Sequence, residues 1–320
     1  MSSVAYVFPG QGSQAVGMGH ALATRSPAAA AVFAEADAAL GESISTIAWE
    51  GPAEVLDRTE HAQPALLTTS IAYLAAAREH WANAGQIEPQ PAFLAGHSMG
   101  QYSAMVAGGA ISLGDGVRLV RERGRLMQAS GTGREGRMAA IIGLDDARLP
   151  DLVARASAHG TFGVANRNSP GQVVVSGERT AVEAAVEIAR ELGARRAIEL
   201  PVSVAAHSPL MADAAERLGA LLATVAFHDP SAPLLANRDA RPLTDAEAAR
   251  AELIEHLTAG VDWVRAVETM AARGVDTFLE IGPGRVLTGL IKRIVPEATA
   301  IAIDAPDAPG GLALPAPADQ

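Results

Sequence analysis

The stretch AFLAGHSMG, residues 92–100, decides the fold, because it runs from a short apolar segment into a turn with two glycines. Four apolar residues that stop at a glycine predict a buried strand ending in a tight turn. A helix-forming stretch begins near Met99, directly after that turn. Buried strands that alternate with helices along a chain indicate an α/β protein with a mostly parallel sheet.

The same stretch contains Gly96-His97-Ser98-Met99-Gly100, which matches the pattern Gly-x-Ser-x-Gly between a predicted strand and a predicted helix. That context is the one in which a serine nucleophile is held on a sharp turn. The helix that follows would offer free backbone N–H groups to a developing oxyanion. The alternative is an ordinary glycine-rich turn, since glycine and serine are common in turns.

Other segments continue the α/β pattern on both sides of this stretch. VAYVF at residues 4–8 is stopped by Pro9-Gly10 and predicts a second buried strand. The helix from Met99 is expected to pass a glycine-rich break at Gly108-Gly109 and to continue through 114–129. We further predict helices at 27–40, 65–82, 211–222, 244–258 and 261–273, and strands at 232–236 and 277–281.

The segment after residue 130 differs in character. Residues 131–136 are glycine-rich and charged, and the predicted order after them is strand 138–142, helix 145–158, strands 162–165 and 172–176, helix 180–191 and strand 196–200. The order β-α-β-β-α-β is that of small ferredoxin-like domains. We therefore expect an α/β-hydrolase-like body of residues 1–130 and 199–305, an inserted ferredoxin-like subdomain of 131–198, and a disordered Pro/Gly/Ala-rich tail of 306–320.

Composition excludes several kinds of chemistry. The chain has 320 residues, 25 Lys+Arg and 36 Asp+Glu, a formal net charge of −11, and no cysteine. Nucleic acid is disfavoured as the main partner, because binding phosphates needs a basic face. Without cysteine there is no disulfide, thiol nucleophile or Cys-ligated zinc, and Lys292 alone could form a Schiff base. No run of about 18 apolar residues and no basic-then-apolar leader occurs, so we expect a cytoplasmic protein without a membrane span.

A serine nucleophile needs a base, and His207 is the best candidate among the eight histidines. It ends the apolar segment 201–206 and precedes Ser208-Pro209, so a strand would deliver it to a turn facing a cleft. His97 adjoins Ser98 but would point away from it on such a turn. Polar helix or loop contexts indicate surface positions for His20, His61, His80, His159 and His228. A structural role for His207 is the alternative.

Five segments in order along the chain resemble the malonyl-CoA:acyl carrier protein transacylases of fatty acid synthesis and the related acyltransferases of polyketide synthesis. A sixth lies near the end, and together they span about residues 4–305. The segments are Phe8-Pro9-Gly10-Gln11-Gly12-Ser13-Gln14, Gly96-His97-Ser98-Met99-Gly100, Arg121-Glu122-Arg123-Gly124, Asn168-Ser169-Pro170-Gly171-Gln172, His207-Ser208-Pro209-Leu210-Met211 and Glu280-Ile281-Gly282-Pro283-Gly284.

This resemblance implies roles for the matched residues. Ser98 would take the acyl group from coenzyme A as an ester, with His207 as general base and then general acid. A main-chain carbonyl, not a carboxylate, would orient the imidazole. The backbone N–H groups of Gln11 and Met99 would form the oxyanion hole, and Arg123 would bind the free carboxylate of the malonyl group.

The chemistry of arginine agrees with that role for Arg123. A guanidinium makes two parallel hydrogen bonds to a carboxylate, which both anchor and orient it. An acetyl group would leave the buried charge unpaired, at a cost of about 2–5 kcal/mol. The alternative is a surface residue in the Arg121, Arg123, Arg125 series.

Other positions match the family less closely. Gln63 and Asn166 would line the acyl pocket, although a structural role is an equal alternative. Malonyl-selective members commonly have Phe before the base histidine, whereas Ala206 stands here, which would enlarge the pocket and admit a substituted malonyl such as methylmalonyl. His256 stands where the family often has Gln, and its main-chain carbonyl would orient His207. Gln101 replaces a common Glu, with no effect that the sequence explains.

The resemblance predicts transfer of a malonyl group from coenzyme A to the phosphopantetheine thiol of an acyl carrier protein, by an enzyme that is a monomer and needs no metal or other cofactor. An acyl hydrolase on the same scaffold is the alternative, and a noncatalytic carrier-docking protein is a third reading. Both coenzyme A and carrier proteins are acidic, so a local basic patch is expected. Its candidates are Arg265, Arg285, Lys292 and Arg293, for which ordinary surface charge is the alternative.

Overall fold

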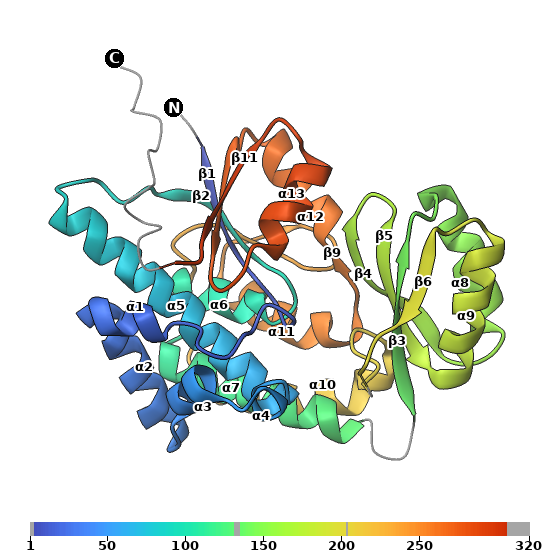
Figure 1. Cartoon of the computed structure of the whole chain (residues 1–320), viewed down its shortest axis with the longest axis horizontal. Coiled ribbons are helices and arrows are strands. Elements are labelled where there is room, and N and C mark those ends of the chain that lie inside the picture. The colour runs from blue at the N-terminus through green and yellow to red at the C-terminus, as the bar shows by residue number, and fades with distance from the viewer. Residues whose placement is uncertain (1–2, 131–134, 203, 306–320) are drawn as a thin grey trace.

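The computed structural model describes residues 3–130, 135–202 and 204–305, which form two β-sheets with helices packed against them (Figure 1). The expected tail and most of the glycine-rich 131–136 segment lie outside the described residues. Within the described residues, no helix is long and apolar enough to cross a membrane.

The first sheet has six strands in the order β11-β10-β1-β2-β7-β8. All neighbours are parallel except β7 and β8, which are antiparallel. The strands are β1 (Val4–Phe8), β2 (Pro91–Gly96), β7 (Leu234–Leu235), β8 (Pro242–Leu243), β10 (Thr277–Ile281) and β11 (Thr299–Ile303). The expected mostly parallel sheet is therefore present, with β1 and β2 side by side at its centre.

Helices cover both faces of this sheet, which explains why every residue of β1 is buried. Tyr6 and Phe8 pack into one core, and Ala5 and Val7 pack into the other, as the alternation of a strand requires. The larger core contains α1 (His20–Arg25), α2 (Pro27–Leu40), α3 (Ile44–Glu50), α4 (Ala53–Leu56), α5 (Thr59–Asn83), α6 (Gly100–Ala107), α7 (Leu113–Ser130), α10 (Ala212–Leu222) and α11 (Ala246–Thr258). The smaller core contains α12 (Trp263–Ala272) and α13 (Val286–Ile294).

The second sheet has five strands in the order β6-β3-β5-β4-β9 and lies at one end of the molecule (Figure 1). Its strands are β3 (Gly136–Ile142), β4 (Phe162–Ser169), β5 (Gln172–Glu178), β6 (Arg196–Glu199) and β9 (Val261–Asp262). The helices α8 (Leu149–Ser157) and α9 (Arg179–Glu191) share a separate core with β3, β4, β5 and β6. The β-α-β-β-α-β order predicted for this segment is thus present.

One prediction was wrong at the start of α12. Residues 261–273 were expected to be helical throughout, but Val261 and Asp262 form β9, which pairs in parallel with Asn166 and Arg167 of β4. The Asp262 side chain then accepts a hydrogen bond from the Arg265 N–H at 3.0 Å and caps the helix, which begins at Trp263. A segment of the large body therefore completes the second sheet.

Several shorter elements also differ from expectation. The helix after residue 99 is two helices, α6 and α7, separated at Gly108 and Gly109. The strand expected at 232–236 is reduced to β7, and the helix expected at 145–158 begins as the 3₁₀ turn Asp146–Arg148 before α8. The elements α1, α3, α4, α13, β8 and β11 were not predicted.

Candidate active site

The candidate site lies at the carboxyl edge of the first sheet. Gln11 follows β1, Ser98 follows β2 and Asn237 follows β7, and these strands are neighbours in the parallel sheet. The carboxyl ends of parallel strands meet at one edge, where α/β proteins bind ligands. The fold therefore brings together residues that are up to 226 positions apart in the sequence (237 − 11).

The turn at 96–100 needs both of its glycines. A Cβ on Gly96 would lie 1.9 Å from the Gly100 carbonyl carbon, and one on Gly100 would lie 2.2 Å from the Phe8 oxygen. Ser98 itself has a φ of 52°, a left-handed conformation that non-glycine residues rarely adopt. Such strain costs about 1–3 kcal/mol and persists only where surrounding contacts hold it.

The side chain of Asn237, a residue not predicted for the site, supplies such contacts. Its Oδ1 accepts from the Ser98 N–H at 2.9 Å, and its Nδ2 donates to the Gly96 oxygen at 2.9 Å. Asn237 therefore holds the turn on both sides of the serine. A signal was present in the sequence, because Asn237 is a polar residue that follows the apolar run 234–236, as Ser98 follows residues 92–95.

Glu252 of α11 holds Asn237 in turn. Its buried carboxyl group accepts a hydrogen bond from the Asn237 N–H at 2.6 Å. Burial raises the pKa of Glu252 to about 8, against the smaller opposing effect of the hydrogen bond from Asn237. Nothing in the sequence pattern of residues 244–258 distinguished this glutamate from the exposed acidic residues beside it.

Gln101, which the sequence left unexplained, ties the turn to the neighbouring strand. Its Oε1 accepts from the Gly96 N–H at 3.1 Å, and its Nε2 donates to the Leu235 oxygen at 2.9 Å. A neutral amide can satisfy a donor and an acceptor at the same time. An ionised glutamate could accept only, so glutamine suits these two buried partners.

Ser98 and His207 face each other at hydrogen-bond distance. The Ser98 Oγ lies 2.8 Å from His207 Nε2. The other ring nitrogen, Nδ1, lies 2.8 Å from the His256 oxygen and 3.0 Å from the Ala259 oxygen. Because carbonyl oxygens only accept, Nδ1 carries the proton, and the Nε2 lone pair accepts the proton of the serine hydroxyl.

The His207 imidazole is kept neutral by its surroundings. Burial is the largest cause and Arg123 the next, and together they lower the pKa of His207 to about 4. A neutral ring is the form that can remove a proton from Ser98. The His207 backbone has a φ of 57°, so both residues of this pair are held in left-handed conformations.

Arg123 of α7 reaches the same point with its side chain 1% exposed. Its Nη1 donates to Gln63 Oε1 at 2.9 Å, and its Nη2 donates to Ser98 Oγ at 3.1 Å. No carboxylate among the described residues forms an ion pair with Arg123, and its Nε has no hydrogen-bond partner there. A buried cation without a counter-ion favours an anionic ligand.

Two backbone N–H groups are the candidates for an oxyanion hole. Met99 directly precedes α6, and Gln11 follows Gly10, whose Cβ position would be 2.6 Å from the His97 oxygen. Among the hydrogen bonds of the described residues, none has the N–H of Gln11 or Met99 as its donor. Both groups are therefore without a protein acceptor among the described residues, and the oxyanion hole expected from the sequence stays a prediction.

Among the described residues, no hydrogen bond joins the side chains of the remaining predicted positions to Ser98, His207 or Arg123. The His97 ring bonds to the second sheet, with its Nε2 2.8 Å from Asn168 Oδ1 on β4. Asn166 is buried on β4, opposite Val261 of β9. Ala206 is half-buried against the larger core. The hydrogen bonds of the described residues do not join Asn166 to Ser98, His207 or Arg123.

The four candidate basic residues are exposed and lie on α12, on α13 or just before α13. Arg285 is paired with Asp304, at 2.7 Å between Nε and Oδ2. Arg293 donates from Nη1 to Gln172 Oε1 on β5 at 2.9 Å. Lys292 and Arg293 occupy the last turn of α13, beside the second sheet.

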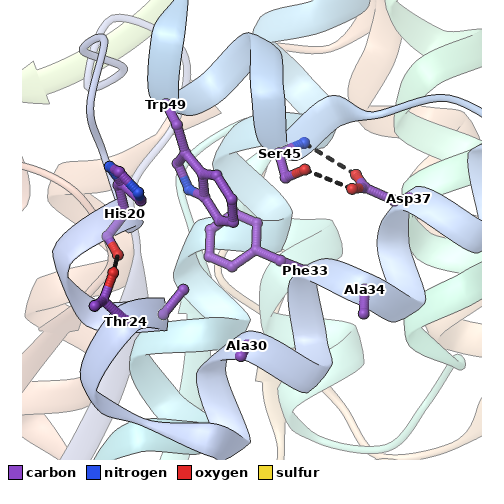
Figure 2. Close-up of a pocket in the computed structure, with 9 residues that line it drawn as sticks. His20, Thr24, Ala30, Phe33, Ala34, Asp37, Ser45 and Trp49 are labelled. Atoms are coloured by element: carbon purple, nitrogen blue, oxygen red, sulfur yellow. Dashed lines mark hydrogen bonds between the residues drawn. The ribbon is translucent and has the colours of Figure 1, made fainter.

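A separate cavity of about 340 Å³ lies between α1, α2 and α3 (Figure 2). The rings of His20 and Trp49 stack in it with centroids 5.0 Å apart, and Ser45 donates its N–H to Asp37 at 2.9 Å. None of the predicted site residues lines it. It is therefore distinct from the candidate site.

Sequence comparisons place the chain in a known family. Residues 5–306 match the family model described as the acyl transferase domain. The chain is 46% identical over 308 residues to a malonyl CoA-acyl carrier protein transacylase of Escherichia coli O157:H7, covering 96% of this chain and 98% of the relative. It is 44% identical to the protein of that name from Bacillus subtilis strain 168, covering 96% of this chain and 95% of the relative.

Solved structures give the same result. An acyl carrier protein S-malonyltransferase from Vibrio cholerae is similar with a TM-score of 0.89 and 44% identity, covering 95% of this chain and 97% of that one. The enzyme from Bartonella henselae gives 0.92 and 43%, covering 97% and 98%. A malonyl-transacylase in complex with a type II polyketide synthase acyl-carrier protein gives 0.89 and 42%, covering 96% and 98%.

The pKa of His207 predicts how activity depends on pH. Since the neutral ring is the base, kcat/KM for acylation of Ser98 should stay nearly constant from pH 7.5 down to 5 and fall as the pH approaches about 4. The unfolded chain takes up this proton near pH 6.5. The free energy of unfolding therefore also decreases as the pH falls from 6.5 to about 4. Steady-state kinetics with circular dichroism at each pH would test this, and an acid limb near 6.5 in a folded sample would contradict it.

Proposed function

The chain belongs to the acyl transferase domain family, and from its site we propose that it moves a malonyl group from coenzyme A to the phosphopantetheine thiol of an acyl carrier protein. The product would supply fatty acid or polyketide synthesis. Relatives that cover nearly the whole chain carry the transacylase name, and one similar structure is a complex with an acyl-carrier protein.

One observation favours malonyl over an uncharged acyl group. The Arg123 guanidinium is buried beside Ser98 Oγ and has neutral partners among the described residues. The free carboxylate of malonyl would provide the missing counter-charge and a two-point hydrogen bond. Acyl groups without a carboxylate would leave this charge unpaired.

The first half-reaction follows from the serine–histidine geometry. As the Ser98 Oγ attacks the thioester carbonyl, its proton passes to His207 Nε2, 2.8 Å away. The N–H groups of Met99 and Gln11 would receive the oxyanion. When the C–S bond breaks, His207 returns the proton to the sulfur, which leaves free coenzyme A and a malonyl ester on Ser98.

The second half-reaction reverses these roles with a different thiol. The phosphopantetheine thiol gives its proton to His207 Nε2 as its sulfur attacks the ester carbonyl. The C–O bond then breaks, and the proton returns to Ser98 Oγ. The two carbonyl oxygens at His207 Nδ1 keep the ring in one tautomer through both steps and stabilise the imidazolium between them.

The finer description of the fold is part of this proposal. An α/β-hydrolase-like body of residues 1–130 and 199–305 and a ferredoxin-like subdomain of 131–198 are supported by the separate core of β3–β6, α8 and α9. The strand β6 ends at Glu199, one residue past that boundary. Coenzyme A enters as substrate, and the proposed steps use no resident cofactor. The cytoplasmic location and the monomeric state remain predictions.

The proposed reaction is tested with malonyl-CoA and a holo acyl carrier protein. We expect malonyl-carrier protein as the product, and a malonyl adduct on Ser98 by mass spectrometry when the carrier is left out. Arg123→Ala should lower kcat/KM for malonyl-CoA by about 30-fold or more, since about 2 kcal/mol or more is lost with one partner of a buried charge pair. Arg125→Ala, which removes an exposed arginine of the same helix, should leave it unchanged.

Two outcomes would contradict the proposal. Free malonate in place of malonyl-carrier protein would show an acyl hydrolase. Absence of any adduct on Ser98 would leave a carrier-docking protein. Malonate release by wild type in the absence of carrier serves as the baseline for the first outcome.

Ala206 predicts tolerance of a larger acyl group. With a methyl in place of an aromatic ring before His207, kcat/KM for methylmalonyl-CoA should stay within about tenfold of the malonyl-CoA value, the lower end of what one methylene is worth. Ala206→Phe should lower the methylmalonyl value more than the malonyl value. A wild-type preference for malonyl above about a hundredfold would contradict this reading of Ala206.

Lys292 and Arg293 remain candidates for docking an acidic carrier protein, since both are exposed in the last turn of α13. We expect Lys292→Glu with Arg293→Glu to raise KM for the carrier and to leave the acylation rate of Ser98 with malonyl-CoA unchanged. Arg25→Glu, an exposed arginine on α1, is the control for a change in total charge. An unchanged KM for the carrier would leave both residues as ordinary surface.

A further inference from the structure

We propose that the His256 side chain is a positioning residue for Arg123: its neutral imidazole accepts a hydrogen bond from the guanidinium and keeps that charge available to the substrate carboxylate. This inference rests on the proposed function, because it assigns the acyl specificity of that site to one more residue. His stands here in place of the expected Gln, and the role predicted from the sequence belongs only to its main-chain carbonyl.

The tautomer of His256 follows from its partners. Its Nδ1 lies 3.1 Å from the Glu252 oxygen, one turn earlier in α11. A carbonyl oxygen only accepts, so Nδ1 carries the proton and Nε2 carries the lone pair. That Nε2 lies 3.4 Å from Arg123 Nη2, a group that only donates. The contact is long, but the direction of the hydrogen bond is fixed, because Nη2 can only donate and this Nε2 can only accept.

The acceptors around Arg123 are all neutral. Gln63 Oε1 accepts from Nη1, and Ser98 Oγ and His256 Nε2 share Nη2. Neutral acceptors fix the direction of the guanidinium plane without cancelling its charge. A carboxylate at position 63 or 256 would pair with the arginine and compete with the substrate. The choice of imidazole and amide therefore suits an arginine that must bind an anion from outside the protein.

The charges around His256 keep its ring neutral. Arg123 and His207 are the charged or titratable groups that act on it, the Glu252 main-chain oxygen accepts from its Nδ1, and the Tyr102 ring lies edge-on with centroids 5.9 Å apart. Burial, Arg123 and His207, in that order, lower the pKa of His256 well below its usual value. A protonated ring would place a second cation against the guanidinium.

The two functions of His256 are carried by different atoms, and so they can be separated. Its main-chain oxygen holds His207, and its side chain contacts Arg123. A change of side chain leaves the carbonyl in place. Acylation of Ser98 by an uncharged acyl group needs the serine–histidine pair and the oxyanion donors but no carboxylate-binding arginine. It therefore reports on the His256 carbonyl, while malonyl acylation reports on both the carbonyl and the side chain.

The test compares malonyl-CoA with acetyl-CoA as acyl donors, with the rate of Ser98 adduct formation followed by mass spectrometry. His256→Leu removes the acceptor and should lower kcat/KM for malonyl-CoA by about tenfold or more, as expected for a lost hydrogen bond to a charged group, with the acetyl-CoA value within about twofold. His256→Gln offers an amide oxygen and should restore the malonyl value to within about threefold. His256→Glu should reduce the malonyl value most, because its carboxylate competes for Arg123.

Two results would overturn the inference. A malonyl-to-acetyl ratio that is unchanged in His256→Leu and His256→Glu would show that the side chain does not position Arg123. Equal losses with both donors would show a purely structural role. If His256→Leu does not fold by circular dichroism, His256→Asn gives the same readout, since it stays polar but is too short to reach Nη2. Failure of the proposed function itself is distinguishable, because wild type would then show no preference for malonyl.

Discussion

The buried charge of Arg123 is the constraint on which the arrangement of the site depends. Its side chain is 1% exposed, yet it has no carboxylate partner among the described residues. Removing a cation from water costs several kcal/mol unless other groups compensate for it. Here the compensation is partial and comes from three neutral acceptors. They are Gln63 on α5, Ser98 just before α6 and His256 on α11. Gly124 allows this convergence, because its Cβ position is 2.6 Å from the Thr59 oxygen of α5. The charge that these neutral acceptors do not cancel remains available to an anionic substrate.

The strained turn at Ser98 depends on contacts from the same side of the molecule. Asn237 holds both ends of the turn, Glu252 holds Asn237, and Glu252 lies one helical turn before His256. The helix α11 therefore supports the serine through one residue, and the base and the arginine through another. Strain at the serine and uncompensated charge at the arginine are two destabilising features that share a single supporting helix.

Much of this could be predicted from the sequence, because its signals are local. The apolar runs at 4–8 and 92–95 correspond to β1 and β2, and the glycines around Ser98 are required by contacts under 2.5 Å. Ser98, His207 and Arg123 could be proposed from motif order. The position of Asn237 after an apolar run was a signal for a site residue, but its contact with Ser98, 139 residues away, could not be predicted. The role of Glu252 could not be predicted either, because only the folded chain places its carboxyl group beside the Asn237 N–H, 15 residues away. The strand β9 was missed for the same reason: two residues become a strand by pairing with β4, and their own sequence does not specify it.

The position of β9 has a consequence for building chimeras in which relatives exchange the subdomain of residues 131–198. The second sheet consists of four strands from one continuous segment and a fifth from residues 261–262, so a cut at the two ends of that segment divides the sheet. In a transplanted subdomain the edge of β4 that pairs with β9 would be unpaired. The protein that loses its subdomain would keep β9, a two-residue strand, without a sheet to join. His97 would lose Asn168 by the same cut, one residue from the serine. A chimera that preserves the pairing of β4 with β9 must therefore include residues 261–262 with the transplanted subdomain. Otherwise the sequences of both strands must be compatible with that pairing.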